Sequence, residues 1–490
     1  PTQGRSAAQG GVGTFLVAES SDWRIVAAVN RRFALGVAFL ALLLGCSRSV
    51  SNIEQTYRPD ARRAQSRASS IVFVPGIMGV ELLDSRDGRS VWGKFLQPGE
   101  DGSQIYEIAL PFAQGRPVAE LRDAIVPGGE LLFAELDLGS VALHARGYPG
   151  ILEGLFQSLV DHGTHHRRTQ AISRSDVEAG RDPIIGFGYD WRRELANETE
   201  RLHAVVLAAS EERLRRTGNA RVDIIAHSMG TQLVRWYLRY GTAPVPTDGS
   251  LPELTWAGVE HVERVLLVGP PNAGSARALE EILEGSHVNP FVPNYPSAVV
   301  ATFPGGYELL PRPDDGLVIW ADTGEPVELY DVAVWERLSW GPFAEDQDDA
   351  LRQLLPETGS REERLAIVRE HVAACLMTAE TFHRALDRPA RPPESVRIHS
   401  FVGDAHETKA ILRVDRDSGS IEWASEDLGD GTVTRTSALS HSHADPEAHP
   451  RIFPHSVHFN RADHLSMPGD PEFLNQALYL LLEAPDPPAP

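Results

Sequence analysis

Short apolar runs alternate with helical patterns through much of the chain. Five runs have the length and composition of strands that are buried on both faces: Ile71–Val74, Pro183–Tyr189, Arg221–Ala226, Val262–Val268 and Val396–Val402. Four stretches have helical periodicity: Gly150–Val160, Ala196–Arg216, Thr231–Tyr240 and Glu472–Leu482. Parallel strands need crossover connections, which are usually helices. The alternation therefore predicts an α/β fold with a mostly parallel central sheet and helices on both faces.

Two hairpins and one irregular segment interrupt this alternation. Val80–Lys94 predicts a hairpin that turns at Arg86-Asp87-Gly88, and Ile411–Trp423 predicts another. From about residue 280 to 393, proline, glycine and aromatic residues are dense, and Arg361–Leu376 has helical periodicity. We expect this segment to be an insertion that forms a cap or lid over the open end of the sheet. A second small domain with no role in access is the alternative.

The start of the chain resembles a bacterial lipoprotein signal peptide. Arg31-Arg32 precede the apolar run Phe33–Leu44, which is shorter than the roughly 20 residues that span a bilayer. Leu43-Leu44-Gly45-Cys46 then resembles a lipobox, whose cysteine is acylated after cleavage. We therefore expect an exported protein, anchored to a membrane through Cys46 and facing the periplasm or the cell exterior. An uncleaved apolar anchor is the alternative.

The composition of the chain predicts where the tether, the folded domain and the tail begin and end. Residues 1–46 form an upstream segment plus the signal peptide, and the polar, Arg- and Ser-rich residues 47–70 form a flexible tether. A single α/β domain is expected over 71–484, and 485–490 form a tail. Because residues 1–28 lie ahead of the signal peptide, we hypothesise that translation of the natural protein starts near Val29.

Charge and cysteine content exclude two classes of protein. The net charge is −22, and no basic stripe is present that could contact a phosphate backbone, so nucleic acid is not an expected partner. The 490 residues include two cysteines, which argues against a disulfide framework.

The pentapeptide Ala226-His227-Ser228-Met229-Gly230 lies between a predicted strand and a predicted helix. This arrangement is typical of a nucleophile elbow, in which a sharp turn lifts the serine hydroxyl clear of the sheet. The residues two positions before and after the serine must be small, as Ala226 and Gly230 are. An ordinary strand-to-helix turn with an N-cap serine is the alternative.

A nucleophilic serine needs a histidine base and a carboxylate that orients it, and in such folds both follow the serine in the chain. Asp430, flanked by Gly429 and Gly431, is the preferred acid, with Asp427 and Asp404 as alternatives. His464, just before the last predicted helix, is the preferred base. It is one of six histidines near the end of the chain: His441, His443, His449, His455, His458 and His464.

Two backbone N–H groups are needed to bind the oxyanion of the tetrahedral intermediate. We assign one to Met229, directly after the nucleophile, and one to Ile77 in the loop Pro75–Gly79, whose glycines permit close approach. A plain Pro-Gly turn is the alternative for that loop. His441-Ser442-His443 lacks the context of a metal site, so no metal or cofactor is predicted.

Six motifs in order resemble the lecithin:cholesterol acyltransferase family of α/β-hydrolases, which includes phospholipases A and diacylglycerol acyltransferases. They cover roughly residues 70 to 484 and lie at Val72–Leu82, Tyr189–Arg192, Ala226–Gly230, Leu267–Ser275, Glu308–Pro311 and Gly429–Val433. The resemblance implies an α/β-hydrolase fold, the catalytic residues Ser228, Asp430 and His464, and acyl transfer from a lipid ester.

The chain also departs from that family. Secreted animal members have a disulfide near the segment that corresponds to Val91–Lys94, where this chain has no cysteine. Trp92 in that segment is a candidate substrate-binding residue, with apolar packing as an equal alternative. For Tyr189-Asp190-Trp191-Arg192, a structural Asp–Arg pair is the favoured interpretation.

The sequence thus predicts a serine O-acyltransferase or phospholipase A that acts at a membrane surface. Its partners would be a phospholipid or other acyl ester and an alcohol acceptor or water. A carboxylesterase or thioesterase on smaller soluble esters is the alternative, followed by a non-catalytic lipid-binding lipoprotein. The sequence specifies neither the acyl acceptor nor the oligomeric state.

Overall fold

The computed structural model describes residues 70–95, 104–130, 133–137, 142–146, 184–287, 294–441 and 451–482. The predicted signal peptide with Cys46, the tether up to residue 69, the predicted helix Gly150–Val160 and the tail 485–490 lie outside these residues. Within the described ranges, no helix is both long and apolar enough to cross a membrane.

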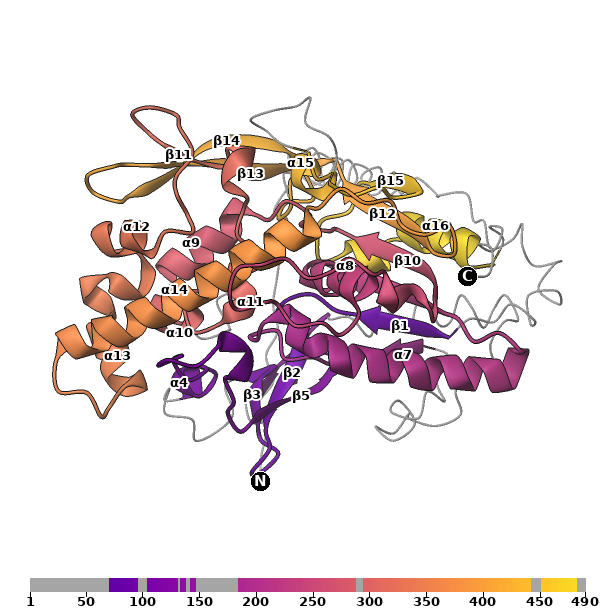
Figure 1. Ribbon diagram of the computed structural model, residues 1–490, viewed down its shortest axis with the longest axis horizontal. Helices are drawn as coiled ribbons and strands as arrows, with labels where there is room; N and C mark the ends of the chain where they lie inside the picture. The colour runs from indigo at the N-terminus through magenta and orange to yellow at the C-terminus, as the bar shows by residue number, and fades with distance from the viewer. Residues whose placement is uncertain are drawn as a thin grey trace, which may run out of the picture. The chain divides into compact units, whose positions relative to one another are not determined.

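A six-stranded sheet, parallel throughout, forms the centre of the molecule (Figure 1). Its strand order is β15-β12-β10-β9-β1-β8. The strands are β1 (Ile71–Val74), β8 (Ile184–Gly186), β9 (Val222–His227), β10 (Val262–Val268), β12 (Arg397–Gly403) and β15 (Ser456–Asn460). The predicted α/β-hydrolase fold with a mostly parallel sheet is confirmed.

Helices cover both faces of this sheet, as β1 shows. Val72 and Val74 belong to the same apolar core as residues of α7 (Leu195–Thr217) and α8 (Met229–Tyr240). Ile71 and Phe73 belong instead to a core with α16 (Pro471–Leu482). Alternate side chains of a strand point to opposite faces, so the apolar run of β1 contributes to both cores.

The first predicted hairpin is confirmed by the antiparallel pairing of β2 (Val80–Asp84) with β3 (Ser90–Trp92). β5 (Ile125–Glu130) pairs with the other edge of β2, a strand that the sequence did not predict. A further small sheet contains β4 (Lys94–Phe95), β6 (Phe133–Asp137) and β7 (Ala142–Arg146). The short helix α4 (Gln104–Glu107) precedes β5.

The segment predicted as an insertion is largely helical. Its elements are α9 (Ala276–Glu284), α10 (Ser297–Val300), α11 (Pro304–Tyr307), β11 (Val318–Trp320), α12 (Val332–Arg337), α13 (Asp348–Leu354) and α14 (Arg361–Leu386). α14 begins where predicted, at a capping box formed by Ser360 and Glu363, but it continues past Leu376 to Leu386. These helices gather on the side toward which β1 points (Figure 1).

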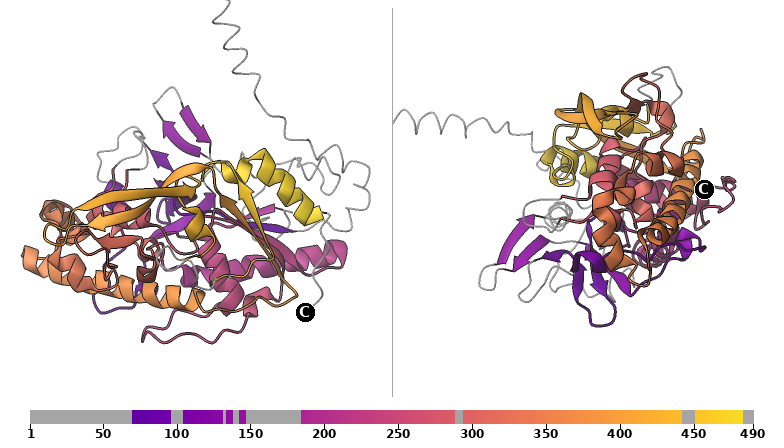
Figure 2. Two further views of the ribbon diagram at one scale, coloured as in Figure 1. Left: turned by 90° about the horizontal axis from the view of Figure 1, so that it is seen from above. Right: turned by 90° about the vertical axis from the view of Figure 1, so that its left-hand side faces the viewer.

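The second predicted hairpin is confirmed and is longer than expected. β13 (His406–Val414) and β14 (Ile421–Gly429) are antiparallel, and β11 of the insertion pairs with β13. The hairpin therefore reaches over the insertion helices (Figure 1, Figure 2). The short helix α15 (Arg435–Ala438) follows β14.

Candidate active site

Ser228 lies at the sharp turn between β9 and α8, with φ 53° and ψ −127°. A positive φ is rare for a residue with a side chain, and it persists only where the surroundings hold it. Its N–H donates to the carbonyl of Val268 on the neighbouring strand (2.9 Å). A Cβ added at Gly230 would lie 2.4 Å from the carbonyl oxygen of Pro75 and 2.7 Å from that of Val74. The small residue is therefore required because the first strand passes so close to the elbow.

The structure brings the three predicted catalytic side chains together. His464 Nε2 lies 2.9 Å from Ser228 Oγ, and His464 Nδ1 lies 2.7 Å from Asp430 Oδ2. All three residues are buried. Because a carboxylate can only accept, Nδ1–H donates to Asp430, which leaves the Nε2 lone pair facing the serine hydroxyl.

Backbone N–H groups of its own loop and of His464 hold Asp430 in place. Its Oδ1 accepts from the N–H groups of Thr432 (3.0 Å) and Val433 (2.7 Å), and its carbonyl accepts from the N–H of His464 (2.9 Å). Burial acts to raise the pKa of the carboxyl, but the interaction with His464 and these hydrogen bonds outweigh it, so the pKa lies below its usual value. The group is therefore ionised at neutral pH.

The alternative acids and bases make other contacts. Asp427 Oδ2 accepts from the Thr436 hydroxyl (2.7 Å). His455 Nδ1 accepts from the N–H of Ile398, and His458 Nε2 pairs with the Ser456 hydroxyl. His443 and His449 lie outside the described residues. Among the residues that the structure describes, no group of three His, Cys, Asp or Glu side chains is placed to hold a metal ion.

His227 is a site residue that sequence reasoning missed. It is fully buried, and its Nε2 lies 2.9 Å from the carbonyl oxygen of His464, to which it must donate. Burial and the neighbouring His464 lower its pKa to about 3, so the ring is neutral and places no positive charge beside the base. Its position beside Ser228 was visible in the sequence, but its contact 237 residues away was not.

The loop after β1 forms a tight turn beside the elbow. β1 and β9 are parallel neighbours, with Val74 opposite Ala226, so the carboxyl ends of both strands meet at one edge of the sheet. The N–H of Gly79 donates to the carbonyl of Gly76 (3.1 Å), and Met78 has φ 61°. Ile77 lies inside this turn and Met229 begins α8, so both predicted oxyanion donors lie at this edge. Their role stays a prediction.

Trp92 packs against the same turn. Its Nε1–H donates to the carbonyl of Met78 (2.9 Å), and its ring contacts those of Trp191 and Tyr295, with centroids 5.3 and 5.7 Å apart. It is 3% exposed. These contacts account for Trp92 as a packing residue, and its proposed part in substrate binding stays a prediction.

Comparisons with known proteins bear on the family resemblance and on the fold. Residues 169–353 match the family model described as lecithin:cholesterol acyltransferase. The resemblance to the lecithin:cholesterol acyltransferase family is confirmed. The matched segment contains Ser228 and Tyr189-Asp190-Trp191-Arg192, whereas Asp430 and His464 lie beyond it. No curated protein matches the chain.

Two solved structures are similar in fold. The Tle4–Tli4 complex contains a chain that is 15% identical and superposes with a TM-score of 0.52, over 84% of this chain and 98% of that one. An acetylester hydrolase from Corynebacterium glutamicum is 13% identical over 66% of this chain and 74% of that one, with a TM-score of 0.19. The first of these supports the α/β-hydrolase fold of this chain.

Proposed function

We propose that the protein is a serine-dependent enzyme that transfers acyl groups from lipid esters. The observation that carries the proposal is the continuous chain of contacts from Ser228 Oγ through His464 to Asp430, at 2.9 and 2.7 Å. Such a relay makes a serine hydroxyl nucleophilic. The match to the lecithin:cholesterol acyltransferase family favours a phospholipid or other lipid ester as the acyl donor.

In the first half-reaction, Ser228 Oγ attacks the ester carbonyl and His464 Nε2 takes the hydroxyl proton. The charge of Asp430 stabilises the imidazolium that forms, while the Ile77 and Met229 N–H groups bind the oxyanion. His464 then returns the proton to the leaving alcohol, which departs and leaves an acyl-enzyme on Ser228.

In the second half-reaction, water or an alcohol attacks the acyl-enzyme carbonyl while His464 Nε2 takes its proton. The bond from the acyl carbon to Ser228 Oγ then breaks, and His464 returns the proton to Ser228 Oγ. Water yields a free fatty acid, and an alcohol yields a new ester. The helices α9 to α14 lie toward the end of the sheet where the elbow is formed (Figure 1). We propose that this insertion caps the acyl site and excludes water, which favours an alcohol as acceptor.

A labelling experiment tests the mechanism. A fluorophosphonate probe is expected to modify Ser228, identified by peptide mass spectrometry, and to leave Ser228→Ala unmodified. Absence of labelling in the wild-type protein would contradict the proposal and favour a non-catalytic lipid-binding protein.

Product analysis tests the substrate. Vesicles of mixed phospholipids with a sterol or diacylglycerol are incubated with the protein, and lipids are measured by mass spectrometry. New sterol esters or triacylglycerol indicate transfer, and fatty acid with lysophospholipid indicates hydrolysis. Turnover of short p-nitrophenyl esters without any vesicle product would instead support a carboxylesterase or thioesterase.

Membrane anchoring is a separate proposal. Cys46 lies outside the described residues, and the lipobox-like Leu43-Leu44-Gly45-Cys46 supports acylation at this residue. Mass spectrometry of the native protein is expected to find a mature N-terminus at an acylated Cys46. Peptides from residues 4 to 22 in the native protein would contradict the proposed start near Val29.

A further inference from the structure

The turn that carries Ile77 is held by three buried aromatic donors. The Tyr189 hydroxyl donates to the carbonyl of Pro75 (2.9 Å), and Trp191 Nε1–H donates to the carbonyl of Val80 (3.2 Å). Together with the bond from Trp92 to Met78, they bind carbonyls before, within and after the turn. Tyr189 and Trp191 are both fully buried.

A hydrogen bond inside the turn, from the N–H of Gly79 to the carbonyl of Gly76, sets the direction of the Ile77 N–H, and the aromatic donors hold the residues on either side of that peptide. In a trans peptide, the C=O of one residue and the N–H of the next point in opposite directions. The carbonyl of Gly76 points into the turn, where it accepts from Gly79, so the N–H of Ile77 points out of the turn. Met78 adopts φ 61°, a strained conformation for a side-chain residue that needs several restraints to persist.

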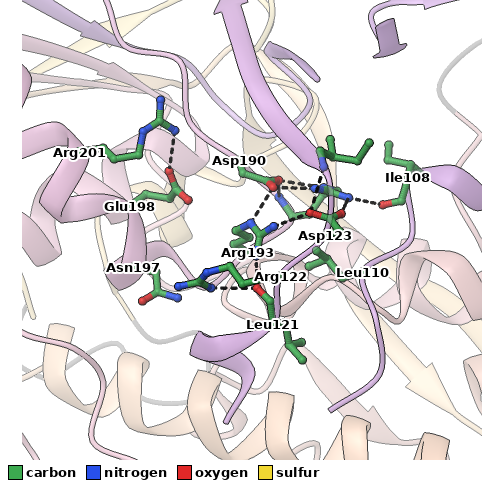
Figure 3. Close-up of polar contacts among 12 residues, drawn as sticks. Ile108, Leu110, Leu121, Arg122, Asp123, Asp190, Arg193, Asn197, Glu198 and Arg201 are labelled. Atoms are coloured by element: carbon green, nitrogen blue, oxygen red, sulfur yellow. Dashed lines mark hydrogen bonds and ion pairs between the residues drawn. The ribbon is translucent and has the colours of Figure 1, made fainter. Parts of the chain in front are cut away.

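Tyr189 and Trp191 belong to the motif Tyr189-Asp190-Trp191-Arg192, whose charged residues hold this segment in place. Arg192 makes a two-point contact with Asp190, Nε to Oδ1 at 2.9 Å and Nη2 to Oδ2 at 2.7 Å. Figure 3 shows Asp190 beside Asp123 and Arg193. Its Nη1 donates to Asp123 (2.8 Å) and to the carbonyl of Ile108 (2.7 Å). Arg193 adds bonds to Asp190 (2.8 Å) and Asp123 (2.6 Å). Buried groups with several such bonds have little freedom to move.

The insertion packs onto the other side of this segment. The N–H of Gly305 donates to the carbonyl of Arg192 (3.0 Å), and the ring of Phe303 contacts that of Trp191 edge-on at 5.7 Å. A Cβ added at Gly305 would lie 2.6 Å from the carbonyl oxygen of Trp191, so only glycine permits this approach. The motif therefore lies between the insertion and the turn.

We propose that Tyr189 and Trp191 are positioning residues that aim the Ile77 N–H at the reaction centre. This inference rests on the proposed function, because it assigns a purpose to the turn only if the site performs acyl transfer. The sequence favoured a structural Asp–Arg pair for Tyr189-Asp190-Trp191-Arg192. The proposal adds a role for its two aromatic residues, because their side chains donate to backbone carbonyls on either side of the turn. An oxyanion donor is useful only when it is already aligned, so removing one restraint reduces the rate and leaves substrate binding intact.

A matched pair of variants tests the proposal. Tyr189→Phe removes the hydroxyl that holds Pro75, and Tyr307→Phe removes an equally buried hydroxyl that donates to the carbonyl of Ala301 (3.0 Å). Each change deletes one buried donor to a backbone carbonyl and keeps the ring, so a purely structural role predicts equal effects.

Three measurements are compared in the two variants: kcat and KM for an ester, the rate of inactivation by a fluorophosphonate, and amide hydrogen exchange over residues 76–80. For Tyr189→Phe we expect kcat and the inactivation rate to fall about tenfold, KM to stay within about twofold, and exchange to rise. Tyr307→Phe is expected to change none of these by more than about twofold.

Equal effects in the two variants, or raised exchange with unchanged kcat in Tyr189→Phe, would overturn the proposal. The exchange measurement needs no substrate. If the wild-type protein neither turns over esters nor reacts with the probe, the proposed function is wrong. If amide exchange over residues 76–80 is unchanged in Tyr189→Phe, the Tyr189 hydroxyl does not restrain the turn. If Tyr189→Phe does not fold, Trp191→Phe, which deletes the bond to Val80, is measured in its place.

Discussion

Two buried aspartates, Asp430 and Asp190, make the same kind of contact and differ in what surrounds their partners. Burial acts to raise the pKa of each carboxyl, and positive or protonatable partners outweigh it, so both pKa values lie below the usual range. The partner of Asp430 is His464, whose other nitrogen faces the Ser228 hydroxyl. The partners of Asp190 are Arg192 and Arg193, which stay charged at all relevant pH values.

The difference between the two sites lies in what else the partner of each carboxylate contacts. Arg192 and Arg193 also bond Asp123 and backbone carbonyls, so their donors are engaged in holding the chain. The second contact of His464 is to the Ser228 hydroxyl, a group that can give up a proton to an imidazole. A buried carboxylate is thus an anchor when its partner is an arginine, and part of a reactive group when its partner is an imidazole that also contacts a hydroxyl.

Neutralising Asp430 is expected to have the largest effect on the rate. Asp430→Asn keeps the shape of the side chain but offers an amide to His464, which can then no longer hold the correct tautomer. We expect kcat to fall about 10⁴-fold with little change in the unfolding midpoint. Steady-state kinetics with an ester and thermal unfolding check this, and wild-type activity in Asp430→Asn would show that another carboxylate orients His464.

Neutralising Asp190 is expected to have the largest effect on stability. Asp190→Asn leaves the guanidinium of Arg192 buried with one carboxylate fewer, and breaking such a pair costs about 3–5 kcal/mol of unfolding free energy. Urea denaturation measures this loss, and residual kcat in the folded fraction is expected to exceed that of Asp430→Asn. If both variants lost activity without losing stability, the distinction between anchor and reactive group would be wrong.

Glu194 is a third buried carboxyl and has no ion pair among the described residues; it accepts from the N–H of Val245. Burial raises its pKa from 4.5 to about 7. The folded state therefore binds the proton more tightly than the unfolded state. Its contribution to stability is complete below about pH 4.5 and is lost as pH rises through about 7, which amounts to about 3 kcal/mol.

Glu194→Gln removes this titration. The unfolding free energy of the variant minus that of the wild type is expected to rise by about 3 kcal/mol between pH 4.5 and pH 8. Denaturant unfolding at both pH values measures it, with the exposed Glu200→Gln on the same helix as the matched control. A constant difference across this range would show that Glu194 is charged in the folded protein.

His227 is expected to give the smallest effect, because it contributes a neutral hydrogen bond. His227→Phe keeps an aromatic ring and leaves the carbonyl of His464 without its donor, at a cost of about 1–2 kcal/mol in stability. Since His227 stays neutral above about pH 3, the acid limb of the pH–rate profile should keep its position. A shifted limb would mean that His227 titrates together with the catalytic groups.

The sequence predicted the elbow and its partners because those features depend on local pattern and chain order. Ser228 lies between a buried strand and a helix, and Asp430 and His464 follow it in the required order. The bonds from Tyr189 and Trp191 to the turn join residues 114 and 111 positions apart, and no local pattern encodes them. For the same reason His227 was missed.

Missed and misjudged elements have similar causes. β15 was not predicted because Ser456–Asn460 alternates half-buried and exposed residues, unlike the continuous apolar runs of the inner strands. The predicted end of α14 was too early because its buried face beyond Leu376 includes polar residues, Thr381 and His383. Both elements are defined by the neighbours they pack against more than by their own periodicity.

The position of β15 has a consequence for how activity is lost. Among the described strands it is one of the two edges of the central sheet, paired to β12 alone, and it leads the chain to His464. Edge strands open more readily than inner ones, and opening here would withdraw the base while Ser228 stays on the intact inner strands. Heat inactivation would then precede global unfolding, and a cooled sample would regain activity without refolding its core.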